Sequence, residues 1–155
     1  AEIRRVILER GSSYTYDKVV GLQGLDFLSQ MLDGLVCTLD GRHEDALAAY
    51  LPIDTETIPA RFGPLVDIDR AWCLLKLGHS EASRVVAEKV AHTVKAVSEH
   101  DDLAYTYARL GQIHADTGDV SLAEHFENLA TAELTQHHTF QQEMLQRLKS
   151  IKLSA

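Results

Sequence analysis

The sequence predicts an all-helical protein of stacked antiparallel helical hairpins, with extra N- and C-terminal helices. Three observations support this fold class. Glycine-led turns recur at Gly41, Gly78 and Gly118, 37 and 40 residues apart, each between an apolar helical segment and an alanine-rich one. All three prolines lie between positions 52 and 64, so the remainder has few helix breakers. A hydrophobic content of 45% can fill the core of a single domain spanning residues 1–155.

The individual helices follow from apolar spacing and from the residues at their ends. We expect helices over residues 2–10, 14–39, 44–51, 65–77, 80–98, 103–117, 121–134 and 140–153. The helix at 14–39 passes through Gly21 and Gly24 and is either one bent helix, which we favour, or two. Pro52 ends the helix at 44–51, and the segment from there to Pro64 is expected to be a loop, with or without one turn of helix.

These helices form three predicted hairpin repeats, at residues 28–51, 65–98 and 103–134, after an N-terminal extension at 1–27. Glycine suits the turns because it ends a helix in a left-handed conformation without a Cβ penalty. The C-terminal helix, within 138–153, has Phe140, Met144, Leu148 and Ile151 at helical spacing. We expect it to cap the open end of the stack. The alternative is a linker that continues as a coiled coil into another domain.

Composition excludes several classes of function. The formal net charge of -8 opposes binding to nucleic acid or to anionic lipid. No apolar stretch approaches the roughly 20 residues that span a bilayer. The two cysteines, Cys37 and Cys73, have neither disulfide nor zinc spacing, and we interpret them as small core residues in a reducing, cytoplasmic protein. A redox role is the lesser alternative for them.

No motif indicates catalysis, a metal or a cofactor. The chain has eight histidines, but no HExxH motif and no His-x3-His pair, and we place His137 and His138 in a loop. The acidic run that includes Asp101 and Asp102 lies at a helix start, where carboxylates cap free N–H groups. Since neither a nucleophile motif nor a phosphate-binding loop is present, we expect a protein that is not an enzyme.

The turn pattern resembles the tetratricopeptide repeat family, most clearly in the third hairpin. The matching residues are, in the third unit, Tyr107, Leu110, Gly111, His114, Gly118, Ala123 and Ala130; in the first, Gly34, Cys37, Ala46 and Tyr50; and in the second, Ala71 and Leu74. Ser83 and Ala87 depart from the pattern in the second unit, and the spacings of 37 and 40 exceed the family's usual 34. The resemblance covers residues 28–134 and implies a right-handed helical solenoid that binds a protein partner.

In that family the first helix of each hairpin lines a concave groove, which implies a binding site here. The positions carried over that we select as the partner-binding groove are Met31, Leu35, Ile68, Trp72, Leu75, Tyr105 and Gln112. Further positions on the same helices are Leu28, Thr38, Leu39, Leu65, Lys76, Ala108, Ala115 and Asp116. This groove is largely apolar and lacks the basic residues with which some family members clamp acidic tails. We expect Trp72 to be the main anchor.

An exposed apolar stripe of this size must be covered. A partner peptide or amphipathic helix is the first candidate. The chain's own N-terminal helix, with Ile3, Val6 and Ile7, is the second, and self-association as a homodimer is the third. The same residues could instead be core between hairpins. A second hypothesis for function is a ligand- or metal-responsive domain that controls an attached effector, as in bacterial regulators in which such repeats precede a transcription-activating or cyclic-dinucleotide domain.

Overall fold

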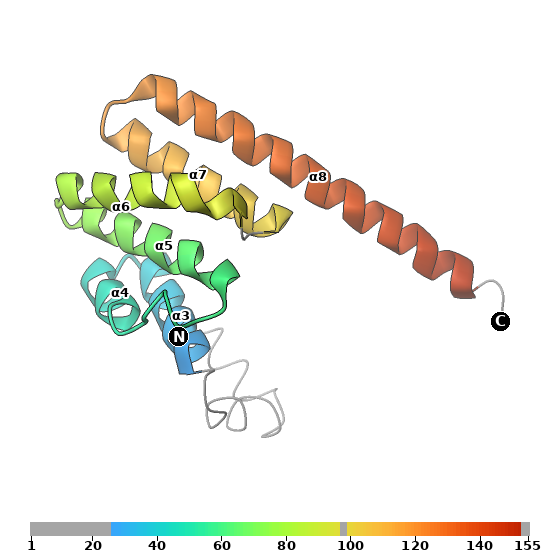
Figure 1. The fold of residues 1–155 in the computed structure, drawn as a ribbon, viewed down its shortest axis with the longest axis horizontal. Helices are drawn as coiled ribbons and strands as arrows, with labels where there is room; N and C mark the ends of the chain where they lie inside the picture. Colours follow the sequence, from blue (N-terminus) through green and yellow to red (C-terminus); the bar gives the residue numbers. More distant parts are fainter. Residues whose placement is uncertain (1–25, 97–98, 153–155) are drawn as a thin grey trace.

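The computed structural model describes residues 26–96 and 99–152, and this part of the chain is all-helical (Figure 1). The prediction of an all-helical fold is confirmed for these residues. Within these ranges six α-helices are separated by short connections, and two 3₁₀ turns, at Ala60–Phe62 and Val94–Ala96, flank the middle hairpin. The α-helices are α3 (Asp26–Leu39), α4 (His43–Tyr50), α5 (Gly63–Lys76), α6 (Ser80–Thr93), α7 (His100–Asp116) and α8 (Val120–Lys152).

Consecutive helices pack as hairpins, α3 with α4, α5 with α6, and α7 with α8. At each turn a glycine has a positive φ, of 74°, 85° and 87° at Gly41, Gly78 and Gly118. The residue after each glycine donates its backbone N–H, over 2.9 Å, to the carbonyl five positions back: Arg42 to Cys37, His79 to Leu74 and Asp119 to His114. These bonds satisfy carbonyls at the helix ends that would otherwise lack a partner. The three turns predicted from the glycines are therefore confirmed.

Helix α5 is the centre of the packing and contacts α3, α4, α6 and α7. One buried cluster joins α5, α6, α7 and α8 around Ile68 and Leu110, and a second joins α3, α4 and α5 around Tyr50 and Val66. Gly34 allows α3 and α4 to approach, because a Cβ there would lie 2.6 Å from the Tyr50 ring. The first helices α3, α5 and α7 thus lie in sequence along one side of the fold.

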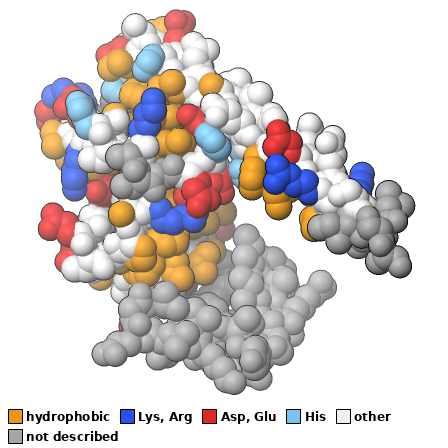
Figure 2. All heavy atoms as spheres, turned by 45° about the vertical axis from the view of Figure 1, so that its right-hand side comes forward, with side chains coloured by type: hydrophobic (Ala, Val, Ile, Leu, Met, Phe, Trp, Pro, Cys, Tyr) orange, Lys and Arg blue, Asp and Glu red, His pale blue; other side chains and the backbone are white. Residues whose placement is uncertain are grey.

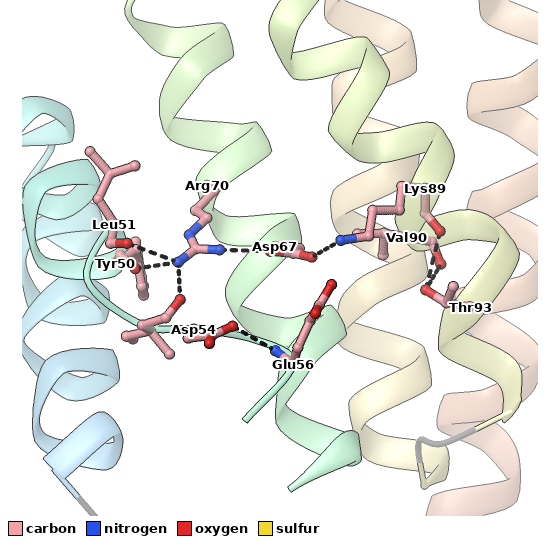
Figure 3. Close-up of polar contacts among 10 residues, drawn as sticks. Tyr50, Leu51, Asp54, Glu56, Asp67, Arg70, Lys89, Val90 and Thr93 are labelled. Atoms are coloured by element: carbon pink, nitrogen blue, oxygen red, sulfur yellow. Dashed lines mark hydrogen bonds and ion pairs between the residues drawn. The ribbon is translucent and has the colours of Figure 1, made fainter. Parts of the chain in front are cut away.

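Arg70 ties the connection after α4 to the central helix (Figure 3). Its Nη2 donates to the carbonyl of Tyr50 at 2.6 Å and also to that of Ile53, while its Nη1 donates to Asp67 at 2.9 Å. Lys89 of α6 reaches the other oxygen of Asp67 at 3.3 Å. Because the last carbonyls of a helix lack partners within the helix, this guanidinium replaces water at the end of α4.

The predicted break between residues 134 and 140 is wrong. Helix α8 runs without interruption over 33 residues, so His137 and His138 lie within a helix. The segment from Thr135 to Thr139 contains neither glycine nor proline, and both threonine hydroxyls bond to the carbonyl four residues earlier. Its weak helix formers lower the stability of a helix only by tenths of a kcal/mol each, which is too little to end it.

The capping helix expected at 138–153 is also not observed as a cap: that part of α8 continues straight beyond the hairpins (Figure 1). Other helix ends differ from expectation by a few residues, and α6 ends at Thr93 rather than at position 98. The helix expected at 2–10, and the part of 14–39 before Asp26, lie outside the described residues. None of the helices in the described ranges is long and apolar enough to cross a membrane.

Candidate interaction face

Trp72 lies where α5 packs beside α7, and charged side chains surround its indole. Lys76, one turn later on α5, places its Nζ 4.2 Å from the ring centroid. Arg109 of α7 places its Cζ 4.4 Å from the same ring and 5.6 Å from that of Tyr105. Residues four apart on a helix share a face, as Trp72 and Lys76 do, and as Tyr105 and Arg109 do. We call these four residues, with Gln112, the Trp72 face.

The buried carboxylate of Asp69, on α5, supports the Trp72 face through hydrogen bonds. It accepts hydrogen bonds from the hydroxyls of Tyr105 at 2.6 Å and Tyr50 at 3.1 Å, which join α7 and α4 to α5. The residue is 6% exposed, and burial raises the pKa of this carboxyl, against the opposing effect of the Tyr105 hydrogen bond. Burial likewise raises the pKa of both tyrosines, so they remain protonated donors. The hydrogen bonds fix Tyr105 in position.

Arg109 is held less completely than its neighbours. Its Nη1 donates to Gln112 at 2.9 Å, and its Nε lies 3.8 Å from Asp69, beyond hydrogen-bond distance. Within the described part of the chain that Nε–H has no hydrogen-bond partner although it is buried. Lys76, by contrast, is paired with Asp116 at 2.6 Å. The face therefore combines two cations with two carboxylates and is close to neutral.

The structure brings together only part of the predicted groove. Trp72, Leu75 and Tyr105 are half-buried at the edge of the cluster around Ile68, and Gln112 is exposed beside Arg109. The assignment of Ile68 to the groove is wrong, because its side chain is fully buried in that cluster. Because α5 has apolar residues on several sides, its sequence does not show which side faces the core.

The two predicted positions on α3 lie apart from the cluster around Ile68, against which Trp72 packs. Met31 packs at the edge of the other buried cluster, around Tyr50, and Leu35 is half-buried. Of the additional positions, Thr38 is buried and donates its hydroxyl to the Gly34 carbonyl at 2.9 Å, while Leu39 is 66% exposed. The groove is thus less continuous than the resemblance implies.

Sequence reasoning missed Asp69, Arg109 and Tyr50 as parts of the site. The groove was expected to be largely apolar, whereas charged groups surround its main aromatic side chain. One signal was present: Asp67 and Asp69 interrupt an apolar helical segment, and buried carboxylates in proteins require partners. The partners of Asp69 come from α4 and α7 and could not be identified by spacing.

Other groups with chemical potential do not form a comparable site. In residues 26–96 and 99–152, no three His, Cys, Asp or Glu side chains are grouped so that they could hold a metal ion. Both cysteines are free thiols, and burial raises the pKa of Cys73, which keeps it protonated and unreactive. His100 of α7 pairs with Glu133 of α8 at 2.5 Å and links the two helices of the last hairpin.

Comparison with known proteins adds no relative. No protein-family model matches the chain, and neither the curated proteins nor the solved structures with which it was compared match it.

Proposed function

We propose that this chain is a tetratricopeptide-like right-handed solenoid that binds a partner peptide or helix on the Trp72 face. The observation that supports this best is the partly exposed indole of Trp72, held beside Lys76 and Arg109 on two packed helices. Tryptophan, tyrosine and arginine dominate the binding energy of protein interfaces, and this face presents all three.

The packing within the hairpins supports the family part of the proposal. A Cβ on Gly34 would meet Tyr50, and one on Gly111 would lie 3.3 Å from the backbone carbonyl of Ala123. Ser83 of α6 donates to the Ala71 carbonyl of α5 at 2.7 Å. Small residues thus stand at the close approaches of each hairpin, at the family positions of Gly34 and Gly111 and, in the second hairpin, at Ser83, which departs from the family pattern but is also small.

Preorganisation supports the functional part. Asp69 holds Tyr105 in place, and Gln112 accepts one hydrogen bond from Arg109, so a partner has little ordering of these side chains to do when it binds. The formal charges of Lys76 and Arg109 are balanced by Asp69 and Asp116. The face therefore suits a segment with an aromatic or aliphatic anchor rather than a strongly acidic tail.

A displayed library of random 12-residue peptides, selected on the full chain, tests the proposal. Peptides selected for binding are expected to lose about 30-fold or more in affinity for Trp72→Ala, because a hot-spot side chain contributes 2 kcal/mol or more. Lys76→Ala, at an exposed position, is expected to weaken binding several-fold. Val85→Ala, on α6 and 56% exposed, is the control and should bind as the wild type does.

Circular dichroism and thermal melts must show that the variants remain folded, since Trp72 also packs on the core. If the selected peptides bound Trp72→Ala and Lys76→Ala as tightly as the wild type, the Trp72 face would not be the binding site.

We also propose a cytoplasmic setting, which the two free thiols support.

A further inference from the structure

A hollow of about 390 Å³ lies between the first two hairpins, on the side of α5 away from Trp72. Its walls come from α4, α5, α6 and the connection after α4, and the α5 residues that line it are Arg70 and Leu74. Residues two apart on a helix point about 200° apart at 3.6 residues per turn, so Arg70 and Leu74 face away from Trp72. The hollow is therefore separate from the Trp72 face.

The lining of the hollow is mainly aliphatic. Its apolar residues come from all four segments and are Leu47, Leu51, Ile53, Leu74 and Val86. Ile53 is buried and Leu51 is exposed, so this surface extends from the interior to solvent. It is concave, unlike the projecting part of α8, where exposed hydrophobic side chains lie beside charged ones on a single helix (Figure 2). Concave, mostly apolar surfaces with a few polar groups are typical of small-molecule sites.

Arg70 fixes one wall of the hollow. Its Nη2 donates to the carbonyls of Tyr50, Leu51 and Ile53, which ties the connection to α5. Its Nη1 donates to Asp67, so both terminal nitrogens are already bonded within the fold (Figure 3). The wall is thus formed before any ligand arrives, and the guanidinium is part of it rather than a binding group for an anion.

Two carboxylates at the hollow have no cation beside them. Asp54 and Glu56 line it from the connection, where Asp54 Oδ1 accepts the backbone N–H of Glu56 at 3.1 Å (Figure 3). Within residues 26–96 and 99–152 neither carboxylate forms an ion pair, whereas the charge of Arg70 is opposed by Asp67, which Lys89 also contacts. Carboxylates on a surface turn are common, but these two border an apolar hollow and therefore select the charge of what enters it.

We propose that this hollow binds a small organic cation with an apolar body, whose charged group lies beside Asp54 and Glu56 and whose body lies on Leu47, Leu74 and Val86. The volume is within the range of small-molecule sites. An anion of the same shape would be repelled, and a purely polar cation would leave the aliphatic lining in contact with water. The site does not depend on the proposed peptide binding, because it lies on the other side of α5.

Titration calorimetry of the full chain with octylamine, octanoate and butylamine tests the ligand class. Octylamine is expected to bind saturably, with a dissociation constant of about 1 mM or below. Octanoate, with the same body and the opposite charge, should bind at least about tenfold more weakly, as should butylamine, which has the charge but half of the body. Equal binding of octylamine and octanoate overturns the proposal, as does an absence of saturable octylamine binding up to about 10 mM.

Substitutions at Val86 and Val85 locate the bound amine. Val86→Trp fills the hollow and should weaken octylamine binding by about tenfold or more. Val85→Trp places the same ring at the neighbouring position of α6, which is 56% exposed and outside the lining, and should leave the constant within about twofold. Thermal melts must show that both variants are folded.

Removal of the two carboxylates tests the charged end without changing the core, because both side chains are exposed. Asp54→Asn combined with Glu56→Gln should weaken octylamine binding by about fivefold or more. Glu124→Gln combined with Glu143→Gln makes the same change in net charge on exposed positions of α8 and should have no effect.

Octylamine binding that is weakened neither by Val86→Trp nor by removal of the carboxylates takes place elsewhere on the chain and overturns the proposal. So does octylamine binding that is seen only in dilute protein, which would identify a second copy of the chain as the occupant of the hollow.

Discussion

Replacing Gly34 by alanine perturbs the point where the first hairpin supports the Trp72 face. A Cβ on Gly34 would lie 2.6 Å from two carbons of the Tyr50 ring, far inside contact distance. That ring is 1% exposed, and its hydroxyl is bonded to Asp69, so it has little freedom to move aside. The substitution must therefore shift either the ring or the helix α3.

The net effect is the difference between two opposing terms. Overpacking a core of this kind costs about 3 kcal/mol at the upper end of its usual range. Alanine within a helix stabilises by about 1 kcal/mol relative to glycine. We expect a net loss of about 2 kcal/mol, and a fall in melting temperature of roughly 4–8 °C for a domain of this size.

Thermal and urea melts of Gly34→Ala provide the measurement, and Tyr50→Leu provides the control background. With the ring removed, only the gain in helix propensity remains, so Gly34→Ala should be neutral or stabilising by about 1 kcal/mol. The reasoning fails if Gly34→Ala is as stable as the wild type when Tyr50 is present, or if its effect is the same in both backgrounds.

Three further predictions concern the buried charges and the turns. Burial raises the pKa of Asp69 above the ordinary 3.8, so the folded chain binds a proton at this carboxyl more readily than the unfolded chain does. The stability of the wild type relative to Asp69→Asn should therefore fall as the pH rises from about 4. The prediction is contradicted if the urea midpoints of the two proteins change in parallel between about pH 4 and 8. Arg70→Met should destabilise by about 2–3 kcal/mol in urea titrations, because the carbonyls after α4 lose their donor; a loss under about 0.5 kcal/mol argues against that role. Gly78→Ala should cost only about 1 kcal/mol in thermal melts, since φ is +85° but an added Cβ meets nothing within 4 Å; a much larger loss would show that space, not conformation, requires glycine there.

The helices with clear end signals were predictable because their causes are local. Glycine at positions 41, 78 and 118 determines where the chain can adopt a positive φ, and the structure has a turn at each of them. Apolar spacing between the turns then defines α5, α7 and the end of α3 to within a few residues. The continuity of α8 was missed because Thr135–Thr139 lacks any strong signal in either direction, and a helix continues by default where nothing ends it.

The composition of the site was less predictable. Helical periodicity predicts which residues share a face of a helix, but it does not predict which other helices pack against that face. Ile68 and Trp72 are one turn apart on α5, yet Ile68 is fully buried within the cluster formed with α6, α7 and α8, whereas Trp72 packs only at its edge and is partly exposed. The cations over Trp72 come from both α5 and α7, and the angle between these helices decides their distance.

The sequence by itself therefore determined that the chain is helical, where its hairpins turn and which aromatic side chains are candidates for an anchor. These features depend on backbone conformations and on apolar periods within about one turn of helix. Only the tertiary structure decided that Tyr50, Asp69 and Tyr105 meet, and that half of α8 projects from the hairpins with apolar side chains such as Phe140 and Leu148 exposed. Contacts between residues 19 and 36 positions apart depend on how whole helices pack, which no local pattern encodes.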